Sequence, residues 1–283
     1  MSSNRGGPWP RGRHGGPLIV EFVGTPGAGK TTLSAELVAL LRARGVDAAT
    51  VLGAARPGAA RTLPGALVAR FAPSALRGPL LWQAFYLQGV VHALRFGMEH
   101  GSLTRRVLGG QLGRAIPAAA KRHILFWFFQ LCGRYRFLAS SRRGPRVLVV
   151  DDGFLHRTVH LHASDAEAPD ADHVAAYVDL LPEPDVVVLV GADRDLCEQR
   201  IRLRGVWPHS RHLTAAELSR YLVHAEQAAA LAVRRARERG WRVVELTNVG
   251  REPSEVVAEL ARVAGLLVAA PPVDARVPAG VNG

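Results

Sequence analysis

Short apolar runs of strand length alternate along the chain with segments in which apolar residues recur every three or four positions. Buried parallel strands are predicted at 18–23, 48–52, 146–151, 186–190 and 241–246. Helices are predicted at 32–43, 80–98, 103–112, 118–138, 194–203, 215–239 and 254–266. Strands that alternate with helices pair in parallel through right-handed crossovers, with helices on both faces of the sheet. The pattern therefore predicts an α/β fold with a central parallel sheet.

The two ends of the chain lack this pattern. Residues 1–16 are rich in Gly, Pro and Arg and predict a disordered basic tail, and the Ala-, Pro-, Val- and Gly-rich residues 269–283 predict a second tail. No apolar segment of secretory type follows the N-terminal arginines, so we expect no signal peptide. One domain is therefore expected at 17–268.

A largely helical and basic region at 53–143 lies in the middle of this domain. Gly and Pro recur in 53–79 too often for regular structure over most of that stretch. Breaks between the helices that follow are expected near Gly101, Gly109-Gly110 and Pro117. We interpret 53–143 as a helical insertion in the sheet-forming domain.

A glycine-rich segment follows the first predicted strand and opens the first predicted helix. Its residues match G-x-x-x-x-G-K-[ST] and are Gly24, Thr25, Pro26, Gly27, Ala28, Gly29, Lys30 and Thr31, with Thr32 next to them. Glycines let successive amides converge on a phosphate, and the helix N-terminus adds partial positive charge. Lys30 is expected to reach the β- and γ-phosphates, and the Thr31 hydroxyl to bind Mg²⁺. The motif predicts a triphosphate site; the alternative is a chance glycine-rich turn.

The strand predicted at 146–151 ends in two acids. Asp151 and Asp152 follow four aliphatic residues, at the carboxyl end where parallel strands form a crevice. We expect Asp151 to hold the magnesium ion, directly or through water, and Asp152 to orient or deprotonate an attacking hydroxyl. The sequence leaves open which aspartate serves which role. A β-turn with an N-cap at 151–153 is the alternative.

Arginines recur near the end of the helix predicted at 194–203. Arg200 and Arg204 lie four residues apart on one helix face, and a basic loop at 206–212 that contains Arg211 follows them. Mobile arginines can close over phosphates, exclude water and stabilise a transferring phosphoryl group. These arginines therefore predict a lid; a solvated, arginine-rich helix is the alternative.

Histidines and one further arginine follow the acid pair. Arg157 is a weaker candidate for a contact to the phosphate acceptor. Among His156, His160 and His162, the pair four residues apart could bind a metal in principle. Because no H-E-x-x-H pattern is present, polar surface or acceptor contacts are the favoured interpretation.

Taken together, these motifs resemble a known family. The phosphate loop, the acid-ended strand, the Arg-x-x-x-Arg-Gly segment and Thr247-Asn248-Val249-Gly250 are similar to the P-loop nucleotide and small-molecule kinases, especially the thymidylate-kinase-like branch. The resemblance covers roughly 18–41, 146–157 and 185–267. It implies a three-layer P-loop NTPase fold, ATP as donor, Mg²⁺, a lid around 200–211 and adenine against the backbone near 248–251.

Two departures from that family bear on the acceptor. The loop residues 25–28 contain no acid, whereas thymidylate kinases usually place one there. Residues 151–153 read Asp-Asp-Gly where the family has Asp-Arg-aromatic, so an arginine for an acceptor phosphate is missing. The departures favour an acceptor with a free hydroxyl, and the 53–143 insertion is the expected acceptor region.

Charge and cysteine content limit the remaining classes. The formal net charge is +12, but only Lys30 and Lys121 of 36 basic residues are lysines, which indicates a compositional bias towards arginine. The basic stretch at 95–146 is either a solvated surface or a face that binds phosphates, nucleic acid or anionic lipid. Cys132 and Cys197 cannot staple a chain of this size, and no apolar run reaches the ~18–20 residues of a membrane helix. We therefore expect a cytoplasmic protein.

The prediction that follows is an ATP-dependent kinase that moves the γ-phosphate onto a small-molecule hydroxyl or a nucleoside monophosphate. The alternative is a P-loop ATPase or switch protein whose basic insertion contacts nucleic acid or membrane. Such hydrolases commonly have a glutamate after the strand-end aspartate, where this chain has Asp152. A GTPase is disfavoured because the chain has no Asn-Lys-x-Asp signature. The expected partners are ATP and a small acceptor, nucleic acid is not favoured, and a homodimer is compatible with the sequence.

Overall fold

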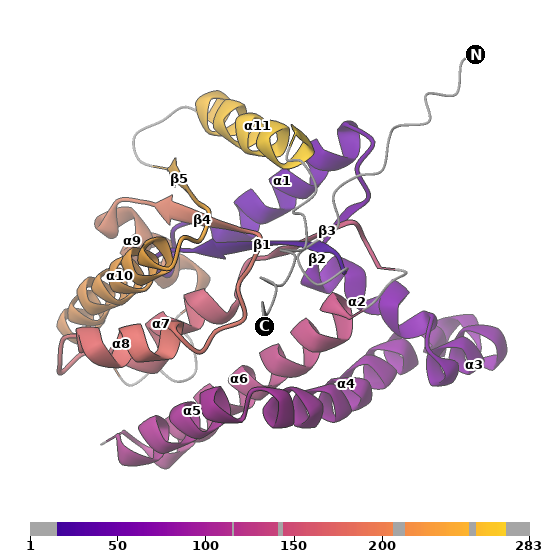
Figure 1. Cartoon of the computed structure of the whole chain (residues 1–283), viewed down its shortest axis with the longest axis horizontal. Helices are drawn as coiled ribbons and strands as arrows, with labels where there is room; N and C mark the ends of the chain where they lie inside the picture. Colours follow the sequence, from indigo (N-terminus) through magenta and orange to yellow (C-terminus); the bar gives the residue numbers. More distant parts are fainter. Residues whose placement is uncertain (1–15, 115, 141–143, 206–212, 249–252, 270–283) are drawn as a thin grey trace, which may run out of the picture.

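Five parallel strands form the centre of the computed structural model, which describes residues 16–114, 116–140, 144–205, 213–248 and 253–269. The strands are β1 (Leu18–Val23), β2 (Ala48–Thr50), β3 (Val147–Val150), β4 (Val186–Gly191) and β5 (Val243–Thr247). They lie in the order β2-β3-β1-β4-β5 (Figure 1). In register, Val20 of β1 pairs with Val149 of β3 and with Val186 of β4. The predicted parallel sheet is confirmed, and the two strands that end at the predicted motifs, β1 and β3, are neighbours.

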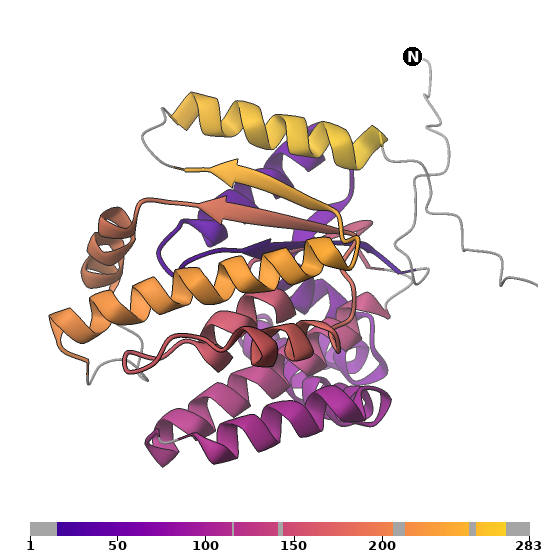
Figure 2. The same ribbon diagram turned by 60° about the vertical axis from the view of Figure 1, so that its left-hand side comes forward.

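Helices cover both faces of the sheet. They are α1 (Lys30–Ala43), α2 (Val51–Ala60), α3 (Leu63–Phe71), α4 (Ser74–Glu99), α5 (Gly101–Gly113), α6 (Ala118–Ala139), α7 (Phe154–His162), α8 (Ala171–Val178), α9 (Arg194–Arg204), α10 (Ala215–Glu238) and α11 (Pro253–Ala269). Helices α1 and α11 lie on one face, whereas α2, α6, α7 and α10 lie on the other, with α4 outside α6 (Figures 1 and 2). The result is a three-layer α/β fold with a central parallel sheet and a helical insertion, as the sequence predicted.

The residues of β1 alternate between the two faces. Leu18, Val20 and Phe22 pack in the core cluster that contains the apolar residues of α1 and α11. Val23 belongs to the cluster on the opposite face, which includes α7 and α10. Because strand side chains alternate with period 2, Glu21 is on the same face as Val23, beneath α7. A single carboxylate is thus buried in an otherwise apolar strand.

The insertion between β2 and β3 is helical, as predicted, but its first part is more regular than expected. The irregular structure predicted over most of 53–79 is wrong, because α2, α3 and the start of α4 occupy it. Thr50 and Thr62 cap α2 and α3 by accepting hydrogen bonds from the amides of Gly53 and Gly65. Buried alanines of α2 pack in one cluster with Phe85 and Leu138 from the longer helices. Capping and packing therefore override the glycine and proline signals.

Other boundaries also differ from the predictions. Helix α5 continues through Gly109-Gly110, so the predicted break there is wrong; the Cβ positions of both glycines are open. Helices α7 and α8 follow the acid pair and have no predicted counterpart, and α11 extends to Ala269. Most of the predicted tails at 1–16 and 269–283 lies outside the described residues, but Gly16 is described and Ala269 is the last residue of α11, so the second tail was predicted to start too early. Among the described helices, none combines the length and the hydropathy that a membrane crossing needs.

Candidate active site

The loop between β1 and α1 depends on glycines at two positions. Gly27 has φ of 86°, and a Cβ there would lie 2.6 Å from the carbonyl oxygen of Cys197. Gly29, with φ of 93°, is the N-cap of α1, and a Cβ there would lie 3.1 Å from the side-chain nitrogen Nδ2 of Asn248. Only glycine adopts these left-handed conformations without strain. The resulting backbone bend leaves room for a phosphate in front of the helix N-terminus.

Lys30 is the buried cation of this loop. Its Nζ donates hydrogen bonds of 3.0 Å to the carbonyl oxygens of Gly24 and Thr25. Burial lowers the pKa of Lys30 to about 8, and the nearby charge of Asp152 opposes this shift. A buried ammonium that binds only carbonyl oxygens keeps its charge poorly compensated, so an arriving anion would stabilise it. Lys30 is thus suited to bind a phosphate oxygen.

Thr31 and Asp151 join the two motifs. The Thr31 hydroxyl donates a hydrogen bond of 2.8 Å to Asp151 Oδ2. A hydroxyl and a carboxylate are the oxygen ligands that Mg²⁺ accepts alongside phosphate oxygens and water. The residues present therefore fit a Mg²⁺–triphosphate, with Thr31 and Asp151 as the metal-side pair. Thr32, the following residue, also lines the cavity described below.

Asp152 lies in a different environment from its neighbour. Its Oδ2 accepts a hydrogen bond of 2.5 Å from the guanidinium of Arg157, a buried residue of α7. Desolvation raises the pKa of Asp152, and the charge of Arg157 counteracts that effect. The structure thus separates the two aspartates, with Asp151 beside Thr31 and Asp152 beside Arg157. Arg157, the weaker candidate, is brought into the site through this ion pair.

Glu21 is a site-adjacent residue that the sequence analysis missed. Its Oε1 accepts hydrogen bonds from the amides of Leu155 and His156, at 2.5 and 3.0 Å, in the first turn of α7. Burial nevertheless raises the pKa of Glu21 to about 8. A Cβ at Gly153 would lie 2.3 Å from the Glu21 carboxyl carbon. Glu21 therefore holds the N-terminus of α7 next to the acid pair. The one sequence feature that could have indicated this role is a single acidic residue in an otherwise apolar strand.

The arginines and one asparagine border the phosphate loop. Arg200 donates to the carbonyl oxygen of Gly27 at 3.3 Å, and Asn248 donates to that of Ala28 at 3.0 Å. Arg204 lines the same cavity as Arg200, as expected for residues four apart on one helix face. The side-chain contact of Asn248 was not predicted, because the resemblance placed only its backbone near adenine. Arg211 and the rest of the loop at 206–212 lie outside the described residues.

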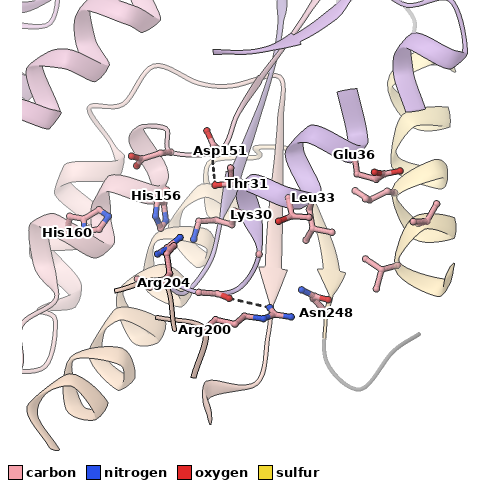
Figure 3. A pocket seen from close by; sticks show the side chains of 18 residues that line it. Lys30, Thr31, Leu33, Glu36, Asp151, His156, His160, Arg200, Arg204 and Asn248 are labelled. Carbon is pink, nitrogen blue, oxygen red and sulfur yellow. Dashed lines mark hydrogen bonds between the residues drawn. The ribbon is translucent and has the colours of Figure 1, made fainter. Parts of the chain in front are cut away.

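One cavity of about 710 Å³ brings these groups together (Figure 3). Its lining residues are Pro26, Gly27, Gly29, Lys30, Thr31, Thr32, Leu33, Glu36, Asp151, Asp152, His156, His160, Arg200, Arg204, Asn248, Val256, Val257 and Leu260. Of the predicted loop residues, Gly24, Thr25 and Ala28 do not line it; their carbonyl oxygens hold Lys30 and Asn248. Within the described part of the chain, no lining residue comes from 53–143.

Two histidines of α7 form the end of the cavity beyond Lys30. Figure 3 shows the His156 ring between His160 and the Lys30 side chain. His156 is buried, and desolvation lowers its pKa well below the ordinary value, with Lys30 and His160 as further causes. Polar surface or acceptor contacts were predicted for these histidines; the polar-surface interpretation is wrong for His156, which is buried, and both rings line the cavity wall.

Comparisons with known proteins find structural similarity at low sequence identity. No family model and no curated protein matches the sequence. Among solved structures, the chain is similar to the deoxyadenosine kinase from M. mycoides with bound dCTP, at 12% sequence identity and a TM-score of 0.38. The match covers 88% of this chain and 99% of the other. At this level of similarity, the substrate and activity have to be inferred from the site.

Proposed function

We propose that this protein is an ATP-dependent phosphotransferase that moves the γ-phosphate of ATP onto a hydroxyl of a small molecule. The observation that carries the proposal is the convergence of Lys30, Thr31, Asp151 and Asp152 on one cavity. In-line transfer needs a cation on the leaving phosphates and a carboxylate on the acceptor side. The cavity wall supplies both. A nucleoside monophosphate is the second acceptor class to test.

The donor side is built from the phosphate loop. Backbone amides at the N-terminus of α1 would hold the phosphates, and Lys30 would exchange its two carbonyl contacts for phosphate oxygens. Thr31 and Asp151 would hold Mg²⁺, which neutralises charge on the β- and γ-phosphates when bound. Arg200, already against the loop, and Arg204 would add positive charge as the phosphoryl group transfers. These roles supply positioning and electrostatic stabilisation, which dominate phosphoryl transfer.

The acceptor side is proposed at Asp152. Arg157 binds one carboxylate oxygen, which fixes the side chain and favours its ionised form. The carboxylate would then orient an acceptor hydroxyl and accept its proton as the bond to phosphorus forms. Because Arg157 is engaged with Asp152, it is less available to bind an acceptor phosphate. This arrangement supports a hydroxyl acceptor over a phosphorylated one.

The insertion at 53–143 remains our proposed acceptor region. Arg134 of α6 helps to hold down the pKa of Asp152, so its charge acts at the acceptor side of the cavity. The Arg134 guanidinium lies 5.6 Å from the ring centre of Tyr86 and 5.5 Å from that of Trp127. Stacked aromatic and guanidinium groups suit a flat ring such as a nucleobase. A nucleoside-like hydroxyl compound is therefore the first acceptor to test. Such an acceptor is compatible with the thymidylate-kinase-like relationship that we propose from the sequence.

The test is phosphate transfer from γ-labelled ATP to a panel of nucleosides, nucleoside monophosphates, sugars and aminoglycosides. A labelled small product that forms with wild type and is lost in Asp152→Asn supports the proposal. Steady ATP hydrolysis that polynucleotide or lipid stimulates, with no labelled acceptor, would favour the ATPase alternative. Arg136→Gln is a matched control, because Arg136 pairs with Glu99 on the outside of the insertion. Its transfer rate should equal that of wild type.

A further inference from the structure

Three side chains at the α7 end of the cavity form a compact cluster. One ligand atom from each of Asp152, His156 and His160 lies within 4.8 Å of the other two. His156 and His160 are one helical turn apart, and their ring centres are 5.4 Å apart at an interplanar angle of 82°. Asp152 joins them from the end of β3. The cluster thus combines two imidazoles and one carboxylate within reach of a single ion.

Two polar atoms of this cluster lack the partner that burial normally requires. In the described part of the chain, neither Asp152 Oδ1 nor His156 Nδ1 has a hydrogen-bond partner, and both are inaccessible to solvent. His156 is only 4% exposed. Leaving a buried polar atom without a partner is costly, and a bound ion or water is one explanation for such atoms in a folded protein. The compact geometry and the unmet polar atoms are separate observations on the same residues.

We propose that Asp152, His156 and His160 bind a divalent transition-metal ion such as Zn²⁺ or Co²⁺. Two imidazoles and a carboxylate suit these ions, whereas Mg²⁺ prefers oxygen ligands alone. Three protein ligands leave a fourth position of a tetrahedral ion open, towards the cavity. This site is distinct from the Thr31–Asp151 pair, which offers oxygen ligands only.

Arg157 has the position of an outer partner of this metal site. It holds Asp152 Oδ2, which leaves Oδ1 for the ion and fixes the orientation of the carboxylate. Arg157 and Lys30 also bring positive charge close to the cluster, which opposes binding of a cation. Triphosphate at Lys30 would relieve part of that repulsion. Metal binding should therefore be tighter in the presence of a nucleotide than in its absence.

The inference does not depend on the proposed function. An ion at the cluster takes the Asp152 oxygen that the proposed function gives to an acceptor hydroxyl, so the metal-bound protein is a state without acceptor, and the acceptor would have to displace the ion from Asp152 before transfer. Histidines that merely contact an acceptor hydroxyl would need no ion. The measurement that separates these possibilities is metal binding itself, in protein without any acceptor.

The test is titration of the full-length protein with Co²⁺, followed by its visible absorption and by isothermal calorimetry, with excess Mg²⁺ present throughout. Excess Mg²⁺ competes with Co²⁺ for the oxygen-only pair at Thr31 and Asp151. We expect one Co²⁺ per chain with the intense absorption of tetrahedral coordination. His160→Ala should weaken binding by more than about 10-fold, because loss of even an outer partner typically costs 10–100-fold. His160 is only partly buried, so this variant should fold.

His173→Ala is the matched control, because His173 is exposed and lies on α8, away from the cavity. It should bind Co²⁺ as wild type does. A second variant, Asp152→Asn, should weaken binding as His160→Ala does. The proposal is overturned if Co²⁺ gives no tetrahedral spectrum. It is also overturned if folded His160→Ala and Asp152→Asn, checked by circular dichroism, bind Co²⁺ with wild-type affinity.

Discussion

The hydroxyl of Thr31 and the carboxylate of Asp151 meet at 2.8 Å, although 120 positions separate them in the chain. Thr31 is in the first turn of α1, and Asp151 directly follows β3. Because β1 and β3 are adjacent parallel strands, the segments after their carboxyl ends come together at one edge of the sheet. This contact is the geometric basis for our proposal that the two residues lie on the metal side of a triphosphate site.

Replacement of Thr31 should weaken the response to magnesium. Thr31→Val keeps the shape of the side chain but removes the hydroxyl that donates to Asp151. We expect the Mg²⁺ concentration for half-maximal transfer to rise by about 10–100-fold, the range typical for a lost metal-site partner. The measurement is the transfer rate as a function of Mg²⁺ at fixed ATP. Thr31→Ser, which keeps the hydroxyl, should remain near wild type; an unchanged Mg²⁺ response in Thr31→Val would remove Thr31 from the metal site.

Nucleotide binding should take up a proton at Lys30. The pKa of Lys30 in the free protein is about 8, because the ammonium is desolvated. Phosphates favour the charged form and raise this pKa, so proton uptake is expected at about pH 8 and above but not near pH 6. The measurement is calorimetric titration with ATP in buffers of different ionisation enthalpy.

Lys30→Arg is the matched variant for this experiment, since a guanidinium stays protonated throughout that range. The uptake at Lys30 should therefore disappear in Lys30→Arg, even where binding is weaker. Equal proton uptake in wild type and Lys30→Arg would assign the proton to another group and contradict the account.

Glu21 should make folding stability depend on pH. Its pKa rises from 4.5 in the unfolded chain to about 8 in the folded protein, because the carboxyl is buried. The folded state therefore binds this proton more tightly than the unfolded state. The resulting contribution to the free energy of unfolding is complete below pH 4.5 and is lost as the pH rises through about 8. For one proton, the slope of the free energy of unfolding against pH cannot exceed about 1.4 kcal/mol per pH unit. Glu21→Gln keeps the carbonyl acceptor for the α7 amides and should remove this component.

Denaturant unfolding of wild type and Glu21→Gln across pH 4.5–9 measures the effect. The stability difference between the two proteins should shift in favour of the glutamine variant as pH rises. A difference that stays constant over the whole range would show that Glu21 does not change its protonation in the folded state.

Arg157 should set the acid limb of the transfer reaction. Its guanidinium lowers the pKa of Asp152 against the effect of burial. Loss of that charge in Arg157→Met raises the pKa of Asp152, so the carboxylate is protonated up to a higher pH. The acid limb of kcat/KM should therefore move to higher pH, and Arg157→Lys should restore part of the shift. A lower rate with an unmoved limb would mean that Arg157 has a structural role only.

The sequence predicted those parts of the site that are local in the chain. Residues 24–31 adopt their bend because of glycines within the motif itself, and Asp151 follows β3 directly. The cluster of Asp152, His156 and His160 depends instead on the start of α7. That start is fixed by a contact of Glu21 from β1 with amides more than 130 residues away. No local pattern encodes such a contact, so α7 and its histidines could not be placed from the sequence.

The same reasoning explains the errors in the insertion. Glycine and proline in 53–79 suggest irregular structure, but Thr50 and Thr62 cap the helices, and alanines of α2 pack against α4 and α6. Helix α5 tolerates Gly109-Gly110 in its interior. Local propensity is a weak guide wherever tertiary packing compensates for it.

Affinity for Mg²⁺–ATP, measured by calorimetry in a pair of lysine variants, tests the central claim most directly. Lys30 and Lys121 are the only lysines of the chain, and Lys121 lies on α6, outside the cavity. Lys30→Met should lose most of the binding, whereas Lys121→Met should bind as wild type does. Equal affinity in Lys30→Met and Lys121→Met would contradict a triphosphate site at the first helix and, with it, the proposed phosphotransferase.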